Sequence, residues 1–275
     1  METHLSISLS QRDNNAKILH ITDTHLFANN DALLGVRTNE SFQAVIDEIK
    51  HQSDDYDLIV ATGDFVQDGS RAAYTRFVQT IKQLPTPCVW LPGNHDVYAE
   101  MKAVFTQHGL PEKKVILVGE HWLIVLLNSQ VVGKPYGYLP PSELEFLAAT
   151  LANYPDRYVA VFLHHHPIRS NCDWLDQHCL KNSDTLGEIV SQHHNIRSIA
   201  WGHIHQAIEK TWYHCHVFST PSTCVQFKPA CHNFTLADDG PGWRVIELSD
   251  NGGVKSMSYS LENDSFLPDI SQQGY

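Results

Sequence analysis

Five short segments of this chain end in side chains that bind metal ions or phosphate groups. They lie between residues 23 and 205: Asp23-Thr24-His25, Gly63-Asp64, Gly93-Asn94-His95-Asp96, His164-His165-His166-Pro167 and Gly202-His203-Ile204-His205. A set of carboxylate, amide and imidazole groups without thiolates suits Fe, Mn, Zn or Co and does not choose between them. The order and number of these segments predict a metal-centred active site.

Most of these segments follow an apolar run rich in β-branched residues. The runs occupy positions 18–21, 58–61, 88–91, 158–163 and 196–201. Short apolar runs bounded by turn residues predict buried strands. In α/β proteins the functional side chains lie at the carboxyl ends of the strands, so we expect these segments to meet at one sheet edge.

The spacing within the segments indicates which side chains share an ion. Asp23 and His25 lie one residue apart, so on an extended strand end they share a face and can hold one metal. The same holds for His203 and His205, unless the chain turns at Gly202 and separates them.

Asp64 stands alone between two paired motifs and is the natural bridge, because the two oxygens of a carboxylate can bind two cations. Two cations about 4 Å apart share the charge of a phosphoryl group and lower the pKa of a bound water. Gly63 and Gly93 precede Asp64 and Asn94, where they let the backbone turn sharply and a ligand approach closely.

Composition agrees with a soluble enzyme. The 275 residues suffice for one large α/β domain or two small ones, and the formal net charge of −12 argues against broad binding of nucleic acid or anionic membranes. No apolar run is long enough to cross a bilayer, and Met1 to Ser6 lack the pattern of a signal peptide. The six cysteines are irregularly spaced, so we expect them to be reduced in a cytoplasmic protein.

Periodicity predicts the remaining elements. Helices are expected at 38–52, with Thr38 or Asn39 as its cap, at 72–84, 97–107 and 184–192, and after Pro140. Strands are expected at 114–118 and 121–127 as a pair, and at 207–212, 214–219, 244–248 and 254–260. The predicted architecture is one domain of two mixed sheets packed together and flanked by helices.

The five motifs together resemble the calcineurin-like (binuclear metallophosphoesterase) family over about residues 17–260. The resemblance implies an α/β fold, a four-layer α/β/β/α sandwich, with residues 1–275 as a single domain. It implies two divalent metal ions, one held by Asp23, His25, Asp64 and His205, the other by Asp64, Asn94, His164 and His203.

The resemblance also implies roles beyond metal binding. His95 and Asp64 are the catalytic residues, with His95 near the phosphate as a proton donor or charge stabiliser, and Asp96 orients His95 or the surrounding loop. The substrate phosphate is expected to contact a set that overlaps the ligands: His25, Asn94, His95, His164 and His205.

Only one histidine of the triplet 164–166 is expected to bind metal. In the family the ligand directly follows the apolar strand, which favours His164 over His165. Strand alternation then predicts that His165 points away, into supporting hydrogen bonds.

A narrower resemblance is to the bacterial class III 3′,5′-cyclic-AMP phosphodiesterases. It rests on idiosyncratic segments at 33–36, 174–178, 219–229, 233–235 and 240–244. It implies hydrolysis of 3′,5′-cyclic AMP to 5′-AMP by in-line attack of a metal-bound hydroxide, with Fe²⁺ as the favoured metal and Mn²⁺ as a substitute. Trp174, Trp243 and Phe227 are candidates to stack on adenine or to pack in the core. His178 is a candidate for a further residue of the active site.

Two other functions stay open. One is a broader phosphodiesterase that acts on glycerophosphodiesters, 2′,3′-cyclic nucleotides or nucleotide diphosphate derivatives. The other is a non-catalytic scaffold member of the family, which predicts lost ligands, whereas every expected ligand is present here. Whether the protein is a monomer or a dimer is open too.

Overall fold

The computed structural model describes residues 4–9, 15–52, 54–262, 264–272 and 274. Met1, Glu2 and Thr3, which belong to the segment tested above for a signal peptide, lie outside the described residues. Within the described part of the chain, no helix combines the length and the apolar character needed to cross a membrane.

In the described part of the chain, twelve strands form two sheets. The larger sheet has seven strands in the order β1 (Leu5–Ile7), β5 (Val115–Val118), β6 (Trp122–Leu126), β7 (Tyr158–Phe162), β8 (Ile196–Trp201), β10 (Cys215–Ser219) and β9 (Glu209–Trp212). Strands β6, β7, β8 and β10 run parallel, and β9 is antiparallel to β10. The smaller sheet has five strands in the order β12 (Val254–Ser260), β11 (Gly242–Leu248), β2 (Ala16–Ile21), β3 (Leu58–Ala61) and β4 (Cys88–Trp90).

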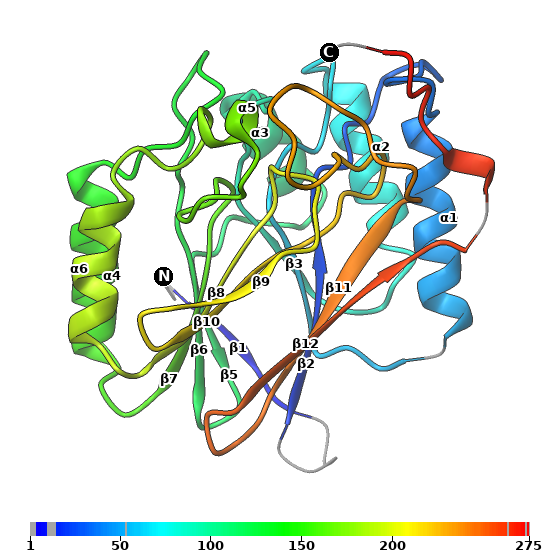
Figure 1. The fold of residues 1–275 in the computed structure, drawn as a ribbon. Helices are drawn as coiled ribbons and strands as arrows, with labels where there is room; N and C mark the ends of the chain where they lie inside the picture. The colour runs from blue at the N-terminus through cyan, green and yellow to red at the C-terminus, as the bar shows by residue number, and fades with distance from the viewer. Residues whose placement is uncertain (1–3, 10–14, 53, 263, 273, 275) are drawn as a thin grey trace.

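Helices cover the outer face of each sheet (Figure 1). Helices α1 (Thr38–His51), α2 (Arg71–Ile81) and α3 (Tyr98–Gln107) share a hydrophobic cluster with the five-stranded sheet. Helices α4 (Pro141–Asn153), α5 (Asp173–Asp176) and α6 (Ser183–Gln192) share another with the seven-stranded sheet. A short 3₁₀ turn, η1 (Asp264–Phe266), lies near the C-terminus.

The apolar runs alternate between two buried faces, and this alternation creates the layers. Along β3, Ile59 and Ala61 pack under the helices, whereas Leu58 and Val60 pack between the sheets. Successive strand residues point to opposite faces, so a strand buried on both sides is apolar throughout. The predicted four-layer α/β/β/α sandwich is confirmed.

One expectation about the elements needs correction, and two short elements were not predicted. Helix α1 begins as predicted, but its N-cap is Arg37 without a side-chain cap. The expected cap residues serve the neighbouring loop instead, because Thr38 Oγ1 donates to His25 O and Asn39 binds Phe27. Strand β1 and helix α5 were not predicted, since three and four residues are too short to show a period.

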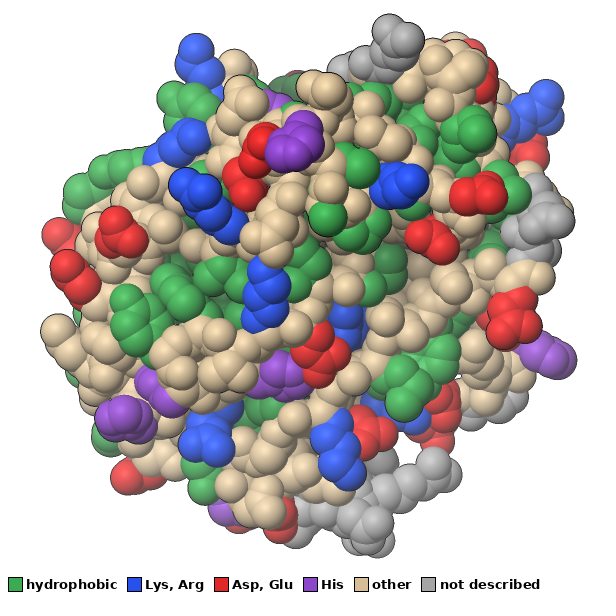
Figure 2. Space-filling view, in the orientation of Figure 1, with side chains coloured by type: hydrophobic (Ala, Val, Ile, Leu, Met, Phe, Trp, Pro, Cys, Tyr) green, Lys and Arg blue, Asp and Glu red, His purple; other side chains and the backbone are tan. Residues whose placement is uncertain are grey.

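One face of the described chain carries charges of both signs (Figure 2). Figure 2 shows acidic and basic side chains interspersed on one face of the described chain, without a broad basic area on that face.

Candidate metal centre

The turns that follow β2, β3 and β4 are tied together by main-chain contacts. Asp23 N donates to Gly63 O over 3.0 Å, and His25 N donates to Asp64 O over 2.9 Å. A Cβ on Gly63 would lie 2.2 Å from Gly93 N, and a Cβ on Gly93 would lie 2.1 Å from Asp64 Oδ1. Glycine is required here because two loops and a carboxylate touch.

Several predicted ligands have a left-handed backbone and do not lie on extended strand ends. The residues with positive φ are Asp23 (54°), His25 (43°), Asp64 (50°), His203 (67°) and His205 (47°). The extended geometry predicted for the first pair is wrong, because β2 ends at Ile21 and the chain turns. Such backbones cost about 1–2 kcal/mol per residue and are retained mainly at functional sites.

The turn also separates the last two histidines. After Gly202 the chain places His203 beside His164, with ring centroids 5.0 Å apart, and His205 beside His25, 5.1 Å apart. This is the alternative that the spacing left open, and it delivers the two imidazoles to different clusters.

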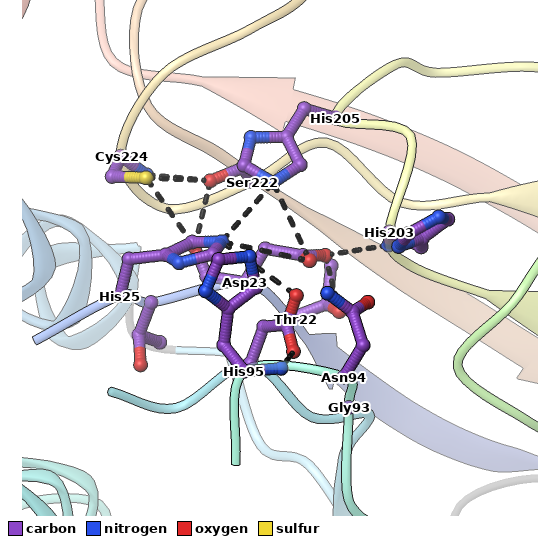
Figure 3. A network of polar contacts seen from close by, with 12 residues as sticks. Thr22, Asp23, His25, Gly93, Asn94, His95, His203, His205, Ser222 and Cys224 are labelled. Atoms are coloured by element: carbon purple, nitrogen blue, oxygen red, sulfur yellow. Dashed lines mark hydrogen bonds and ion pairs between the residues drawn. The ribbon is translucent and has the colours of Figure 1, made fainter. Parts of the chain in front are cut away.

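The first cluster contains Asp23, His25 and His205 (Figure 3). Asp23 Oδ1 lies 3.4 Å from His205 Nε2 and 3.9 Å from His25 Nε2, and the two imidazole nitrogens are 3.3 Å apart. All three side chains are buried, and Asp23 Oδ1 has no hydrogen-bond partner among the described residues.

The second cluster contains Asp64, Asn94 and His164. His164 Nε2 lies 3.2 Å from Asp64 Oδ2 and 3.1 Å from Asn94 Oδ1. The same Asp64 oxygen lies 3.9 Å from His25 Nε2, so this carboxylate stands between the two clusters. Donors that each bind one cation at about 2.1 Å are about 3.0–3.4 Å apart in octahedral or tetrahedral geometry, close to these spacings.

Each imidazole in the two clusters is held by its far nitrogen. The bonds run from His25 Nδ1 to Gln67 Oε1 (2.8 Å), from His164 Nδ1 to Thr62 O (2.6 Å) and from His205 Nδ1 to Val225 O (2.8 Å). A donor bond from Nδ1 sets the tautomer and leaves Nε2 with a free lone pair, which is the usual arrangement around a metal-binding histidine.

Charges in the clusters perturb one another strongly. Burial, and then His95, lower the pKa of His25 to about 3. Burial opposes charge on Asp64 and His164, but each favours charge on the other: the pKa of Asp64 falls well below its usual value and that of His164 rises to about 9. In the absence of a cation, His164 is therefore protonated and Asp64 is ionised.

His95 and Asp96 occupy the loop after β4. The half-buried His95 ring meets His25 edge to face at 4.9 Å, and His95 N donates to Asp64 Oδ1 over 2.8 Å. Asp96 accepts hydrogen bonds from Gly93 N, Phe65 N and the Tyr74 hydroxyl, so it braces the loop.

His165 lies differently from the prediction. Its Nδ1 bonds to Ser129 Oγ at 2.8 Å, which is the expected supporting contact. Its ring does not point away, however, but lies 4.7 Å from that of His203. Strand alternation fails here because β7 ends at Phe162, two residues before His164.

A cavity of about 460 Å³ adjoins the clusters. Its lining includes Asn94, His95 and His203 on the metal side and Lys134, Trp174, His178 and Phe234 further out. A larger cavity of about 530 Å³ beside β1 touches none of the cluster residues.

Of the aromatic candidates, Trp174 lines this cavity and contacts Phe227 and Phe234 edge to face. Phe227 stacks on His205 with centroids 4.4 Å apart. Trp243 is fully buried against Tyr259, so it is a core residue.

Sequence reasoning missed several residues that hold the candidate ligands in place through hydrogen bonds. Ser222 Oγ and Cys224 Sγ both bind Asp23 O, and Ser222 Oγ accepts from Cys224 N (Figure 3). They belong to the segment 219–229, which supported the narrower resemblance above but did not indicate these contacts. Gln67 carries no sequence signal, and a carbonyl such as Val225 O cannot carry one.

Residues 16–207 match the family model for calcineurin-like phosphoesterases. The chain therefore belongs to the calcineurin-like phosphoesterase family, whose members use a binuclear centre of divalent metals.

Two relatives align over nearly the whole chain. The chain is 45% identical over 276 residues to the 3′,5′-cyclic adenosine monophosphate phosphodiesterase CpdA of Escherichia coli strain K12, covering 100% of both proteins. It is 44% identical over 260 residues to the protein of that name from Haemophilus influenzae, covering 94% of this chain and 95% of the relative.

Solved structures share the fold at low sequence identity. A dimetal phosphatase from Danio rerio superposes with a TM-score of 0.61 at 13% identity, covering 89% of this chain and 98% of that one. GAP50, described as the anchor in the inner membrane complex of Plasmodium, superposes with a TM-score of 0.62 at 12% identity, covering 94% and 90%.

Proposed function

We propose that this protein hydrolyses 3′,5′-cyclic AMP to 5′-AMP at a centre of two divalent cations. The observation that carries the proposal is the pair of adjoining donor clusters, with the Asp64 carboxylate 3.2 Å from His164 and 3.9 Å from His25. The two full-length relatives, both named as cyclic-AMP phosphodiesterases, support the substrate.

The ligands divide between the clusters. We assign one metal to Asp23, His25, Asp64 and His205, and the other to Asp64, Asn94, His164 and His203. The donors fit such ions: Asp23 Oδ1 and His203 Nε2 are buried without hydrogen-bond partners among the described residues, and all donors are oxygen or nitrogen. Iron(II) is the favoured metal and manganese(II) its substitute. When bound, the ions supply positive charge that acidifies water and neutralises a phosphoryl group.

The chain's own residues then bind and protonate the substrate. We assign contacts with the phosphate to His25, Asn94, His95, His164 and His205. His95 is half-buried and lines the adjoining cavity, where its imidazole protonates the 3′ oxygen as that oxygen leaves. Asp96 keeps the His95 loop in place by binding Gly93 N.

The cavity beside the clusters accepts the nucleoside. Its volume of about 460 Å³ is within the usual range for small-molecule sites, and Trp174 and Phe234 offer aromatic surface to a base. The complete donor set, with every expected ligand retained, favours this enzyme over the non-catalytic scaffold.

Two properties of the whole chain complete the proposal. We infer that residues 1–275 act as a single catalytic domain. We also place the enzyme in the cytoplasm, because its six cysteines are all unpaired, as expected in a reducing compartment.

The test is steady-state hydrolysis of cyclic AMP by metal-free protein reconstituted with iron(II) or manganese(II), with the product identified. We expect metal-dependent formation of 5′-AMP. Asp64→Asn should remove most of the turnover, whereas the same change at the exposed Asp47 should have no effect.

Comparison substrates separate the rival functions. Brisk cleavage of an aryl phosphodiester, a 2′,3′-cyclic nucleotide or a glycerophosphodiester, with little turnover of cyclic AMP, would support the proposed metal centre. The same result would reject cyclic AMP as the substrate. No turnover of any ester by metal-loaded protein would favour the scaffold.

A further inference from the structure

A line of buried hydrogen bonds leads from His20 to the carboxylate of Asp23. His20 Nε2 lies 2.8 Å from Thr62 Oγ1, Thr62 Oγ1 lies 2.8 Å from Thr22 Oγ1, and Thr22 Oγ1 lies 2.6 Å from Asp23 Oδ2. At the other end, His20 Nδ1 lies 2.6 Å from Thr220 Oγ1. All five side chains are completely buried, so water cannot substitute for any of these partners.

The line crosses between the two sheets. His20 belongs to β2, and its ring meets Phe162 of β7 edge to face at 5.2 Å. Thr62 follows β3 in the same sheet, whereas Thr220 follows β10 in the other. Gly202 is required beside this line, since a Cβ there would lie 1.9 Å from Thr22 Oγ1.

The direction of every bond follows from one fact, that each hydroxyl has a single proton. A metal-binding Asp23 is ionised and only accepts, so Thr22 must donate to it. Thr22 then accepts from Thr62, and Thr62 in turn must accept from His20 Nε2–H. A neutral His20 has no proton left for Nδ1, which therefore accepts from the Thr220 hydroxyl.

His20 is suited to remain neutral. Its complete burial, and then the charge of Arg244, lower its pKa to about 3. Arg244 lies opposite His20 in the register of β11 and β2 and is itself buried. Burial between a guanidinium and apolar side chains keeps the imidazole uncharged, and the hydroxyls on either side select its tautomer.

The end of the line decides which Asp23 oxygen is available. Oδ2 accepts from Thr22 Oγ1 at 2.6 Å and from His203 N at 2.9 Å (Figure 3). Oδ1 has no hydrogen-bond partner among the described residues and faces His205 and His25. One oxygen is thus occupied by protein donors and the other is free.

We propose that His20, as the Nε2–H tautomer, acts through Thr62 and Thr22 as a positioning residue that orients Asp23 to bind metal through Oδ1 alone. The inference rests on the proposed role of Asp23 as a metal ligand. Donors to a ligating carboxylate orient it and tune the ion, and bonds in a line polarise one another.

The first test reads the tautomer in metal-free protein. Long-range ¹H–¹⁵N NMR distinguishes a protonated Nε2 from a protonated Nδ1, and His20→Gln identifies the His20 signals by their loss. We expect a neutral His20 with its proton on Nε2. A proton on Nδ1, or a charged ring, would overturn the proposal.

The second test measures manganese(II) affinity by calorimetry without substrate. Thr22→Val should weaken binding about 10- to 100-fold, since it removes a direct donor to the carboxylate. Thr62→Val and His20→Leu should cause smaller losses, and His20→Gln, whose amide can donate to Thr62 and accept from Thr220, should restore affinity. Thr150→Val, a buried threonine on α4, is the matched control and should bind manganese normally.

A double mutant distinguishes hydrogen bonds that act together on Asp23 from residues that each stabilise the fold independently. If the line acts as one unit, Thr22→Val/Thr62→Val binds manganese no more weakly than Thr22→Val. Additive losses, or variants that lower thermal stability while leaving affinity unchanged, would overturn the positioning role. Failure of wild-type protein to bind manganese would instead reject the proposed metal centre, whereas the tautomer in metal-free protein still tests the line.

Discussion

At the scale of residues, the candidate centre depends on nitrogen and oxygen atoms whose other contacts are already made. His25, His164 and His205 each have Nδ1 bound to a protein oxygen, so that Nε2 faces the cluster. Asp23 follows the same rule, with Oδ2 occupied and Oδ1 free. Preorganisation of this kind keeps the donors in place before an ion arrives, which reduces the entropy lost on binding.

His95 provides a prediction about the leaving group. His95→Ala should lower kcat for cyclic AMP by about 10²–10⁴-fold, because the departing 3′ alkoxide needs a proton. An aryl phosphodiester, whose phenolate leaves readily, should lose much less, and manganese affinity should be unchanged. Steady-state kinetics with both substrates test this, and equal losses would contradict the role of proton donor.

His164 provides a prediction about protons. Its pKa of about 9 lies above the unperturbed 6.5, so its interaction with Asp64 stabilises the metal-free fold below pH 6.5 and is lost as the pH rises through 9. A metal-binding imidazole is neutral, so at pH 7 manganese binding should release about one proton. Burial and the charge of Asp64 raise the pKa of Asp96 to about 7, so Asp96 should add a fraction of a proton to this release. Calorimetry in buffers of different ionisation enthalpy measures the release, and heats independent of the buffer would refute it.

At the scale of elements, parallel strands lead to the candidate ligands, and the tight turns after these strands orient the side chains. The turns after β2 and β3 are joined by main-chain hydrogen bonds, among them Asp23 N to Gly63 O and His25 N to Asp64 O, and the turn after β4 packs on them at Gly93. Because the turns touch, the position of each ligand depends on the shape of its neighbours as much as on its own strand.

The contact between Gly63 and Gly93 can be tested directly. Gly63→Ala should lower the free energy of unfolding by about 2–4 kcal/mol, through a left-handed φ of 89° and a Cβ 2.2 Å from a backbone nitrogen. Gly133→Ala is the matched control: its φ is 71°, but nothing lies within 4 Å, so only the backbone cost of about 1–2 kcal/mol remains. Urea denaturation measures both, and equal losses would show that the contact is unimportant.

The helix α5, missed by sequence periodicity, presents Trp174 to the cavity. Base stacking on an aromatic side chain is worth about 1–3 kcal/mol, so Trp174→Ala should raise KM for cyclic AMP about 5- to 150-fold. KM for an aryl phosphodiester, which has no nucleobase, should change little. Trp212→Ala on the edge strand β9 serves as the control, and a parallel rise for both substrates would exclude a role in base binding.

At the scale of the whole molecule, the centre lies where the two sheets meet. Asp23, Asp64 and Asn94 follow strands of the five-stranded sheet, whereas His164, His203 and His205 follow strands of the seven-stranded sheet. A cation held by both groups would cross-link the sheets, so we expect metal binding and global stability to be coupled.

Manganese at 100 times its Kd should therefore stabilise the folded protein by about 2.7 kcal/mol per site. Thermal unfolding with and without metal measures the effect. Asp64→Asn, which alters the carboxylate between the clusters, should largely remove the stabilisation, and Asp47→Asn on the surface of α1 should preserve it. Full stabilisation of the Asp64 variant would contradict a bridging carboxylate.

Much of the fold was predictable because it depends on local patterns. Apolar runs such as Leu58 to Ala61 coincide with strands, and the spacing of Phe42, Val45, Ile46 and Ile49 matches the buried face of α1. The identity of the candidate ligands was predictable too, because Asp, Asn and His after buried strands are informative as residue types. These features depend on residues close together in the sequence, because the spacing of apolar side chains differs between helices and strands.

Tertiary structure decided how those residues are aimed. Whether His203 and His205 can share an ion depends on the turn at Gly202, which packs against Thr22. The direction of the His165 side chain depends on the residue at which β7 ends. The partners of the imidazoles include carbonyls, which every residue possesses, so no sequence pattern identifies them. The line that ends at Asp23 runs from Thr220 through His20 and Thr62 to Thr22, and only the packing of two sheets brings such distant positions within hydrogen-bond reach.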